Sequence, residues 1–350
     1  MSSRNALLDV AAVCIIGATV KVTASVLVPL CFAALLAAVL WPPVHFLVAR
    51  RVPWSLSLTL VTGGAMLLLL VAANVLVQAA DGFLGALPEY VQELNAVWRD
   101  AVSWLEGHGV RVGDMLDTGM PEPGAVLSSI GGLLSSVASA ASSVLMVVLL
   151  ALFLLVETEG LADKTRRAFG DSETTEHILG AGHALQQYLV VKTIISLVTG
   201  ILVAGSLWGL GLEHAVLWGF VAFLLNYIPN VGSIIAAMPA VALALVTGGI
   251  VQAGLVSGVY LAVNMLIGNW MEPRVMGDSM GLSPLVVLLA LLLWGWMWGP
   301  AGMLLSVPLT VLLKEMFAVH ASTRWIAEYL GPNRELPRRT QAQGVAPAAR

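Results

Sequence analysis

Residues 215–271 read AVLWGFVAFLLNYIPNVGSIIAAMPAVALALVTGGIVQAGLVSGVYLAVNMLIGNWM and contain no Asp, Glu, Lys or Arg. A soluble domain carries about 25% charged residues, so a charge-free run of 57 residues favours burial in a membrane. Its first half is interrupted by Asn226-Tyr227-Ile228-Pro229-Asn230-Val231-Gly232. Non-helical backbone at membrane depth leaves N–H and C=O groups unpaired unless protein or a water-filled cavity covers them. The stretch therefore predicts a membrane-embedded helix, broken where a small polar pathway passes, which favours a transporter over an anchor.

The composition of the whole chain indicates the same class. Hydrophobic residues make up 58% of the 350 residues and charged residues 11%, with a mean hydropathy of +0.89. One membrane crossing needs about 20 mostly apolar residues. Candidate spans are 7–22, 26–48, 54–77, 138–156, 189–210 and 252–271. We expect an all-α polytopic membrane protein with about six to eight transmembrane helices and two re-entrant helical hairpins.

Charge is distributed unevenly among the polar segments. Segment 81–136 holds eight acidic and two basic residues, whereas Arg50-Arg51, the cluster at 164–167 and the tail from Lys314 are basic. Because Lys and Arg mark the cytoplasmic side, both termini are predicted to be cytoplasmic and 81–136 extracytoplasmic. Apolar residues at helical spacing over 87–105 predict an amphipathic helix, lying on the membrane or against a partner chain.

These features divide the chain into six parts. They are N-terminal transmembrane helices (1–80), an extracytoplasmic amphipathic and loop segment (81–136), a transmembrane helix (137–156), a cytoplasmic helical segment (157–187), a transport core with interrupted helices (188–318) and a cytoplasmic, partly disordered tail (319–350). Within the core, 215–247 and 284–313 each place a Pro/Gly break between two apolar halves. Each half has about 15–17 residues, at or below the spanning limit, which favours two hairpins; the other topology lets all four halves cross.

The first candidate site is the break itself, formed by Asn226, Pro229, Asn230 and Gly232. Broken helices near the bilayer midplane present helix ends and free carbonyls that bind ions and polar substrates. The two Asn side chains add further donors and acceptors. The alternative interpretation is a proline kink whose polar groups are satisfied by a neighbouring helix. The break at Gly299-Pro300 is predicted to line the same path.

The second candidate site contains Asn269, Glu272 and Arg274, between two strongly apolar stretches. An ionisable residue at membrane depth indicates function: Glu272 would take a proton or bind a cation, and Arg274 would be its counter-charge or a substrate contact. Lys192, inside an apolar helix, either snorkels or pairs with Glu272. The alternative is an interfacial loop with a solvated Glu272 and a snorkelling Arg274. Structural motif positions around this site and the second break are Pro273, Gly277, Gly281, Pro284, Gly299 and Pro300.

Patterns typical of enzymes and of cofactor sites do not occur in the sequence. It has no HExxH, P-loop or dinucleotide-binding glycine pattern, and its six His residues are scattered. Gly277-x-Ser279-x-Gly281 matches the hydrolase elbow, but that elbow needs a strand–turn–helix setting and a partnered His. We therefore expect no enzyme activity, no catalytic residue, no metal, no cofactor and no nucleic-acid partner.

Two stretches resemble the autoinducer-2 exporter family of bacterial membrane proteins. They are LLNYIPNVGSIIAAMPAVALAL at 224–245 and MEPRVMGDSMGLSPLVVLLALLLWGWMWGPAGMLLSVPLTVLLK at 271–314. The segment YLVVKTIISLVTGILVAGSLWGLGL at 188–212 is also similar. The resemblance implies a permease of the bacterial inner membrane with re-entrant hairpins and a homo-oligomeric assembly. Residues that match the family's two motifs are Asn226, Pro229 and Gly232, and Glu272, Pro273, Gly277, Gly281 and Pro284.

Activities in that family include export of the furanosyl signal autoinducer-2 and, for other members, exchange of sodium or lithium for protons. We therefore expect a secondary transporter that exports a small polar solute, coupled to an ion or proton gradient, with membrane lipid as its surroundings. Two alternatives stay open: a Na⁺(Li⁺)/H⁺ antiporter and a membrane scaffold without flux. An intramembrane enzyme would require Ser279 to be essential.

Overall fold

The structure, a computed structural model, describes residues 3–108, 124–125, 128, 131–132, 144–170, 173–229, 231–276, 281–319 and 322–332. Its described residues form helices and no β-strand. The elements are α1 (Ser3–Val22), α2 (Ala24–Ala49), α3 (Trp54–Gly107), α6 (Val144–Phe169), α7 (Glu173–Gly209), α8 (Ala215–Leu225), α9 (Val231–Val263), the π-helix η2 (Asn264–Met271), α10 (Glu272–Met276), α11 (Pro284–Val319) and α12 (Arg324–Leu330).

Six helical stretches in the described part of the chain are long and apolar enough to cross a membrane. They are Ala24–Ala49, Trp54–Gly107, Val144–Ala168, Leu179–Gly209, Val231–Val275 and Pro284–Val319. The prediction of an all-α polytopic membrane protein is therefore confirmed. Side chains such as Leu67, Phe153 and Ile201 are more than 60% exposed on these helices, as expected for surfaces that face lipid.

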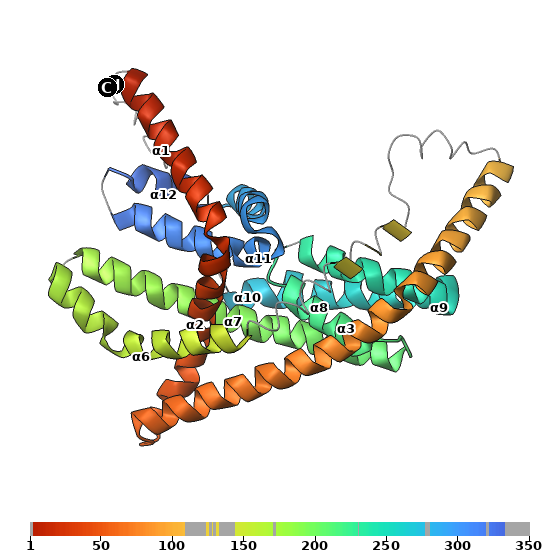
Figure 1. Cartoon of the computed structure of the whole chain (residues 1–350), viewed down its shortest axis with the longest axis horizontal. Coiled ribbons are helices and arrows are strands. Elements are labelled where there is room, and N and C mark those ends of the chain that lie inside the picture. Colours follow the sequence, from red (N-terminus) through yellow and green to blue (C-terminus); the bar gives the residue numbers. More distant parts are fainter. Residues whose placement is uncertain are drawn as a thin grey trace, which may run out of the picture.

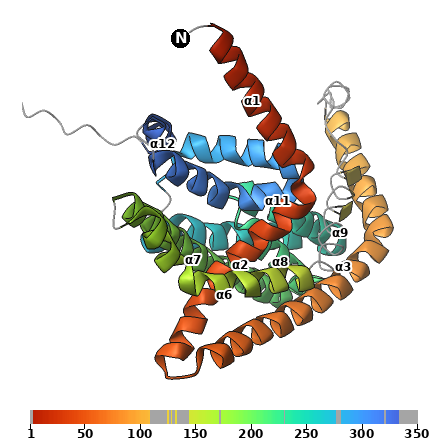
Figure 2. The same cartoon turned by 60° about the vertical axis from the view of Figure 1, so that its left-hand side comes forward.

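Helix α7 lies at the centre of the arrangement. It packs most extensively against α8 and also contacts α2, α9, α11, η2 and α10 (Figure 1). Figure 2 shows α3 curving around the outside of this body and α1 projecting away from it. The residues that α7 turns inward therefore meet the interrupted segments of the C-terminal half.

Helix α3 runs through the boundary predicted at 80/81. Its 54 residues correspond to about 80 Å of helix, far more than the roughly 30 Å hydrocarbon core. The predicted span 54–77 and the predicted amphipathic helix 87–105 are thus one continuous element. Its outer part docks on the core: the Tyr90 hydroxyl donates to Glu213 Oε2 at 2.6 Å, and the Phe83 ring lies 5.0 Å from that of Trp218, centroid to centroid.

The chain reverses direction at Gly299, inside α11. Its backbone there (φ 62°, ψ −143°) belongs to a region that only glycine adopts without strain. The two arms, 284–298 and 300–319, pack together, and Trp294 Nε1 donates to Thr310 Oγ1 at 3.2 Å. The first arm is about 22 Å long, shorter than the hydrocarbon core. The hairpin predicted over 284–313 is therefore present as two helical arms, which continue to Val319.

The first break separates α8 from α9. Helix α8 is only 11 residues long, or about 16 Å, and the chain leaves it through Asn226 and Pro229 before α9 begins at Val231. A second glycine-dependent turn follows at Gly249 (φ 68°, ψ −167°), at the boundary that the sequence places between 215–247 and 252–271. Helices α8 and 231–248 pack on each other in one apolar cluster.

Gly232 lets α9 start directly against the end of α8. A Cβ at this position would lie 1.8 Å from the Leu225 carbonyl oxygen, whereas one at Gly254 would meet no heavy atom within 4 Å. We expect Gly232→Ala to lower the free energy of unfolding by about 1–3 kcal/mol or to prevent folding, and Gly254→Ala to be neutral or to raise it by up to about 1 kcal/mol. Thermal unfolding of both variants in detergent measures this. Equal unfolding midpoints would show that the break is not tightly packed.

Candidate functional site

One face of α7 carries buried polar side chains inside an apolar helix. Tyr188, Lys192, Ser196 and Thr199 follow one another at intervals of four, four and three residues, which places them on the same side of the helix. Each is at most 9% exposed. Buried polar groups need partners, and the partners of this face come from the broken segments.

Lys192 is paired with Glu272. The ammonium nitrogen lies 2.5 Å from Glu272 Oε1, and the two side chains are 3% and 17% exposed. Glu272 is the first residue of α10 and follows η2 directly. The sequence left two interpretations of Lys192, and the structure has the pairing rather than snorkelling. Burying either charge alone would cost several kcal/mol, so each charge requires the other.

Arg274 is not the counter-charge of Glu272. It is exposed, and its guanidinium lies over the Trp270 ring, 4.0 Å from the centroid. Asn269 is also exposed, on the outer side of the π-helix. Of the second candidate site, the structure therefore brings Glu272 and Lys192 together and leaves Asn269 and Arg274 outside that contact.

The first break attaches to the same face of α7. Asn226 Nδ2 donates to Ser196 Oγ at 2.9 Å, and the Tyr227 hydroxyl lies 2.7 Å from Thr193 Oγ1. The break and Glu272 thus contact successive turns of one helix. Two polar side chains of the break thus have partners on a neighbouring helix, a contact that both the pathway interpretation and the proline-kink interpretation allow. The same contacts also place the break beside the ion pair.

A cavity of about 20 Å³ lies next to these contacts, between α7, α8, α9 and η2. Its polar lining consists of Thr199, Asn226, Ser233, Tyr260 and Asn264. The Tyr260 hydroxyl is buried and has no hydrogen-bond partner among the described residues. A buried hydroxyl without a partner is unusual and calls for a ligand or water in the adjacent space. A small space with several polar side chains in its lining therefore lies beside the break.

The π-helix η2 connects the cavity to the ion pair. It begins with Asn264, which lines the cavity, and ends at Met271, directly before Glu272. Its eight residues make it long for this conformation, since π-helices are rare and mostly single turns at functional sites. Sequence periodicity gave no sign of it.

The second hairpin tip does not border this cavity. The Trp298 indole beside Gly299 donates to the Val20 carbonyl at 3.0 Å, and Lys21 lies over the Trp296 ring, so the tip packs on the end of α1. The prediction that Gly299-Pro300 lines the same path as Pro229 is not supported by this arrangement. The two breaks look alike in sequence but contact different parts of the fold.

The remaining motif positions that the structure describes lie near helix ends or in the break. Pro273 is exposed within α10, Gly281 has φ +52° before α11, and Pro284 is the first residue of α11. Pro229 is half-buried in the break and Gly232 is fully buried. Asn230 and Gly277 lie outside the described residues, as does Ser279 of the elbow pattern.

Sequence reasoning missed Ser196, Thr199, Tyr260 and Asn264. A signal existed for all four: Ser196 and Thr199 continue the face of Lys192, and Tyr260 and Asn264 are one helical turn apart, with Asn264 about two turns before Glu272. Uncharged polar residues are, however, common in apolar helices. The fold distinguishes them: Thr199, Tyr260 and Asn264 line one cavity, and Ser196 binds Asn226 beside it.

The family assignment follows from comparison with known proteins. The sequence profile described as "AI-2E family transporter" matches residues 10–321, nearly the whole chain. The chain belongs to the AI-2E transporter family. One relative is the AI-2 transport protein TqsA of Escherichia coli (strain K12), 36% identical over 296 residues that cover 84% of this chain and 86% of that protein. The putative transport protein YhhT of the same strain is 34% identical over 336 residues, covering 95% and 96%.

Membership of the AI-2E family confirms the resemblance found in the motifs at 224–245 and 271–314. A putative transport protein of Haemophilus influenzae is likewise 34% identical over 339 residues, covering 95% of this chain and 97% of that protein. The relatives are transport proteins, not enzymes, by name. This AI-2E protein is accordingly a multi-pass membrane protein of a transport family.

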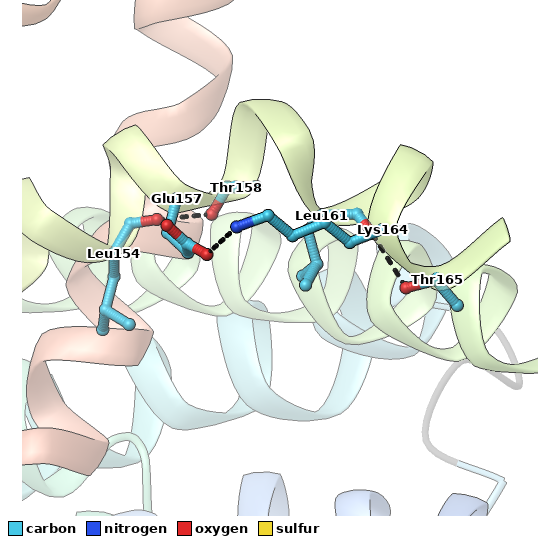
Figure 3. Close-up of polar contacts among 6 residues, drawn as sticks. All are labelled: Leu154, Glu157, Thr158, Leu161, Lys164 and Thr165. Atoms are coloured by element: carbon cyan, nitrogen blue, oxygen red, sulfur yellow. Dashed lines mark hydrogen bonds and ion pairs between the residues drawn. The ribbon is translucent and has the colours of Figure 1, made fainter. Parts of the chain in front are cut away.

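A second ion pair in the chain provides a matched comparison for Lys192–Glu272. Lys164 and Glu157 pair on α6, where Thr158 and Thr165 hydroxyls donate to the carbonyls of the preceding turn (Figure 3). Their side chains are 58% and 60% exposed. Exposed pairs contribute about 0–1 kcal/mol, whereas removal of one partner from a buried pair costs about 3–5 kcal/mol.

We expect Lys192→Met to lower the free energy of unfolding by about 3–5 kcal/mol, because it leaves the Glu272 carboxylate buried without a cation. Lys164→Met should change it by less than about 1 kcal/mol. Chemical unfolding in detergent, run as a double-mutant cycle with Glu272→Gln, measures the coupling. The combination Lys192→Met with Glu272→Gln should recover part of the loss. If both Lys variants lost the same small amount, the inner pair would not depend on burial.

Proposed function

We propose that this AI-2E protein is a secondary transporter that exports a small polar solute of the autoinducer-2 kind and is coupled to an ion or proton gradient. The observation that carries the proposal is the largely buried Lys192–Glu272 pair, which η2 connects to the polar cavity at the helix break. Ionisable groups at membrane depth mark ion and substrate pathways. The relative TqsA, named as an AI-2 transport protein, supports the choice of solute.

Glu272 is the proposed coupling acid. Protonation of its carboxylate would leave the Lys192 ammonium buried without a partner, a state that costs several kcal/mol unless the site opens to water. A proton gradient would in this way change the relative stability of two conformations, as alternating access requires. Asn226 and Tyr227 of the break bond to Ser196 and Thr193 of α7, within one turn of Lys192, so the break would respond to the same movement.

The cellular setting belongs to the same proposal. The protein resides in the bacterial inner membrane as a homo-oligomer, with both termini and the basic cluster at 164–167 in the cytoplasm and segment 81–136 outside. The distribution of Lys and Arg supports this orientation.

The outer part of α3 is joined to the transport core by a hydrogen bond. Glu213, in the turn before α8, accepts it from the Tyr90 hydroxyl of α3.

A Na⁺(Li⁺)/H⁺ antiporter is the second candidate, and the size of the cavity favours it. A space of about 20 Å³ is enough for about one water molecule, whereas pockets for organic ligands measure about 300–1,000 Å³. In this conformation the cavity admits an ion but not a furanosyl solute. A solute exporter must therefore open a wider path in another conformation.

Flux into proteoliposomes tests the coupling role. Glu272→Gln should abolish solute or cation flux driven by a pH gradient, because an amide does not exchange a proton. Since this variant also leaves Lys192 without its counter-charge, its helical content and elution as a single species in detergent are measured alongside, and only folded protein is reconstituted. Glu157→Gln, which alters the exposed pair on α6, should transport like the wild type. Undiminished coupled flux in the Glu272→Gln variant would remove Glu272 from the mechanism. Parallel assays with small polar solutes and with sodium or lithium gradients separate the two candidate functions.

A further inference from the structure

The outward side of η2 and of the helices that flank it changes in character along its length. Leu261 of α9 and Met265 of η2 are apolar, Trp270 of η2 is aromatic and Arg274 of α10 is charged, and all four are exposed. Residues four apart are neighbours on an α-helix, and residues five apart are joined in a π-helix. The intervals in this set are four, five and four residues. The four side chains therefore form one outer stripe that runs from an apolar to a basic end.

The basic end of the outer stripe lies at a membrane boundary. The helix from the Gly249 turn to Met271 carries no charged residue and is about 33 Å long at α-helical rise, close to the roughly 30 Å hydrocarbon core. Glu272 follows but is turned inward to its ion pair, so Arg274 is the first charge on the outward side. Trp is enriched at the membrane–water interface, which is where Trp270 lies. Both side chains are thus at the level of the lipid headgroups.

The Arg274 guanidinium has a support but no acceptor among the described residues. It lies over the Trp270 ring, 4.0 Å from the centroid, and the salt bridges in the described part of the chain join other residues. By contrast, Arg99 on the outer part of α3 donates to the Asn95 carbonyl at 3.2 Å. Guanidinium groups stay charged and bind phosphate through two parallel N–H bonds. A phosphate group therefore complements Arg274 in both charge and geometry.

We propose that the outer stripe is a binding site for one anionic phospholipid. Its phosphate accepts hydrogen bonds from Arg274, its glycerol region lies against Trp270, and an acyl chain follows Leu261 and Met265. A choline lipid is a poorer ligand, because its quaternary ammonium brings a second cation close to the guanidinium. The lipid would brace the outer side of the segment that leads, on its inner side, to Glu272. This site is additional to the proposed function and does not depend on it.

Photocrosslinking of the full-length protein in phosphatidylcholine nanodiscs tests the site locally. Phosphatidylglycerol or phosphatidylcholine with a diazirine in one acyl chain is added at the same trace fraction, and labelled peptides are quantified by mass spectrometry. Labelling of 261–276 is divided by that of the peptide containing Ile201, which is exposed on α7. We expect the preference for phosphatidylglycerol to be about fivefold higher in the wild type than in Arg274→Gln, the effect of one basic residue near an anionic lipid. Arg99→Gln should label like the wild type.

Arg274→Gln breaks no ion pair among the described residues, so its unfolding temperature in phosphatidylcholine should match that of the wild type. Arg274→Lys keeps the charge without the planar fork and should show an intermediate preference. Equal labelling of the wild type by both lipids, or a preference that persists in Arg274→Gln, would overturn the site. So would the absence of labelling by either lipid, which would mean that a second copy of the chain covers this face. Loss of the preference on addition of inorganic phosphate would replace the lipid with a free anion.

Discussion

Two opposite charges stay inside this helical body because Lys192 and Glu272 meet there. Burial of either residue alone would be unfavourable, since an unpaired ion in an apolar interior costs several kcal/mol of folding free energy. Their contact at 2.5 Å fixes the start of α10 against the middle of α7. It therefore also fixes η2, which precedes Glu272, and the wall of the cavity to which η2 contributes Asn264. The position of the candidate site follows from this one contact.

Every interruption in the apolar segments removes helical hydrogen bonds from some backbone groups. The breaks in this chain are built in two different ways. At 226–229 the side chains of Asn226 and Tyr227 bond to Ser196 and Thr193 of α7. At Gly249 and Gly299 the chain turns at a glycine with positive φ, so that one helix ends where the next begins. The first solution keeps polar side chains together inside the body. The second places no residue of either turn in the lining of the cavity, so only the first break contributes to the candidate site.

The sequence predicted what depends on local pattern. The charge-free run at 215–271, the glycines and prolines within it and the length of its halves led to helices, breaks and hairpins at the right places. The continuity of α3 was not predicted, because a change from apolar to acidic residues at Asp81 alters the surroundings of a helix without ending it. The break at Gly299 was expected to share the path of Pro229, because the two are equivalent in composition. They differ in what packs against them, and that is a tertiary property.

The site itself was predicted only in part, for the same reason. Glu272 and Lys192 stood out because charge is rare in these segments, yet they are 80 residues apart and only the fold shows that they pair. Tyr260, Asn264, Ser196 and Thr199 are unremarkable one at a time. They become a candidate site only in the fold, where α7 faces α9 and η2 across a space too small for a solute. Asn269 and Arg274, which lie close to Glu272 in sequence, are turned outward by the winding of η2 and α10.

The π-helix gives the two parts of the site a mechanical connection. In η2 each hydrogen bond joins residues five apart, one more than in an α-helix, so the segment carries an extra residue per turn relative to its neighbours. Asn264 at one end faces the cavity, and Glu272 directly after the other end faces Lys192. Both contacts constrain the winding between them, because a return to α-helical bonding would rotate one end relative to the other. Loss of either contact removes one of the two constraints that hold this uncommon conformation. The ion pair and one wall of the cavity are therefore joined by a single eight-residue segment of the backbone.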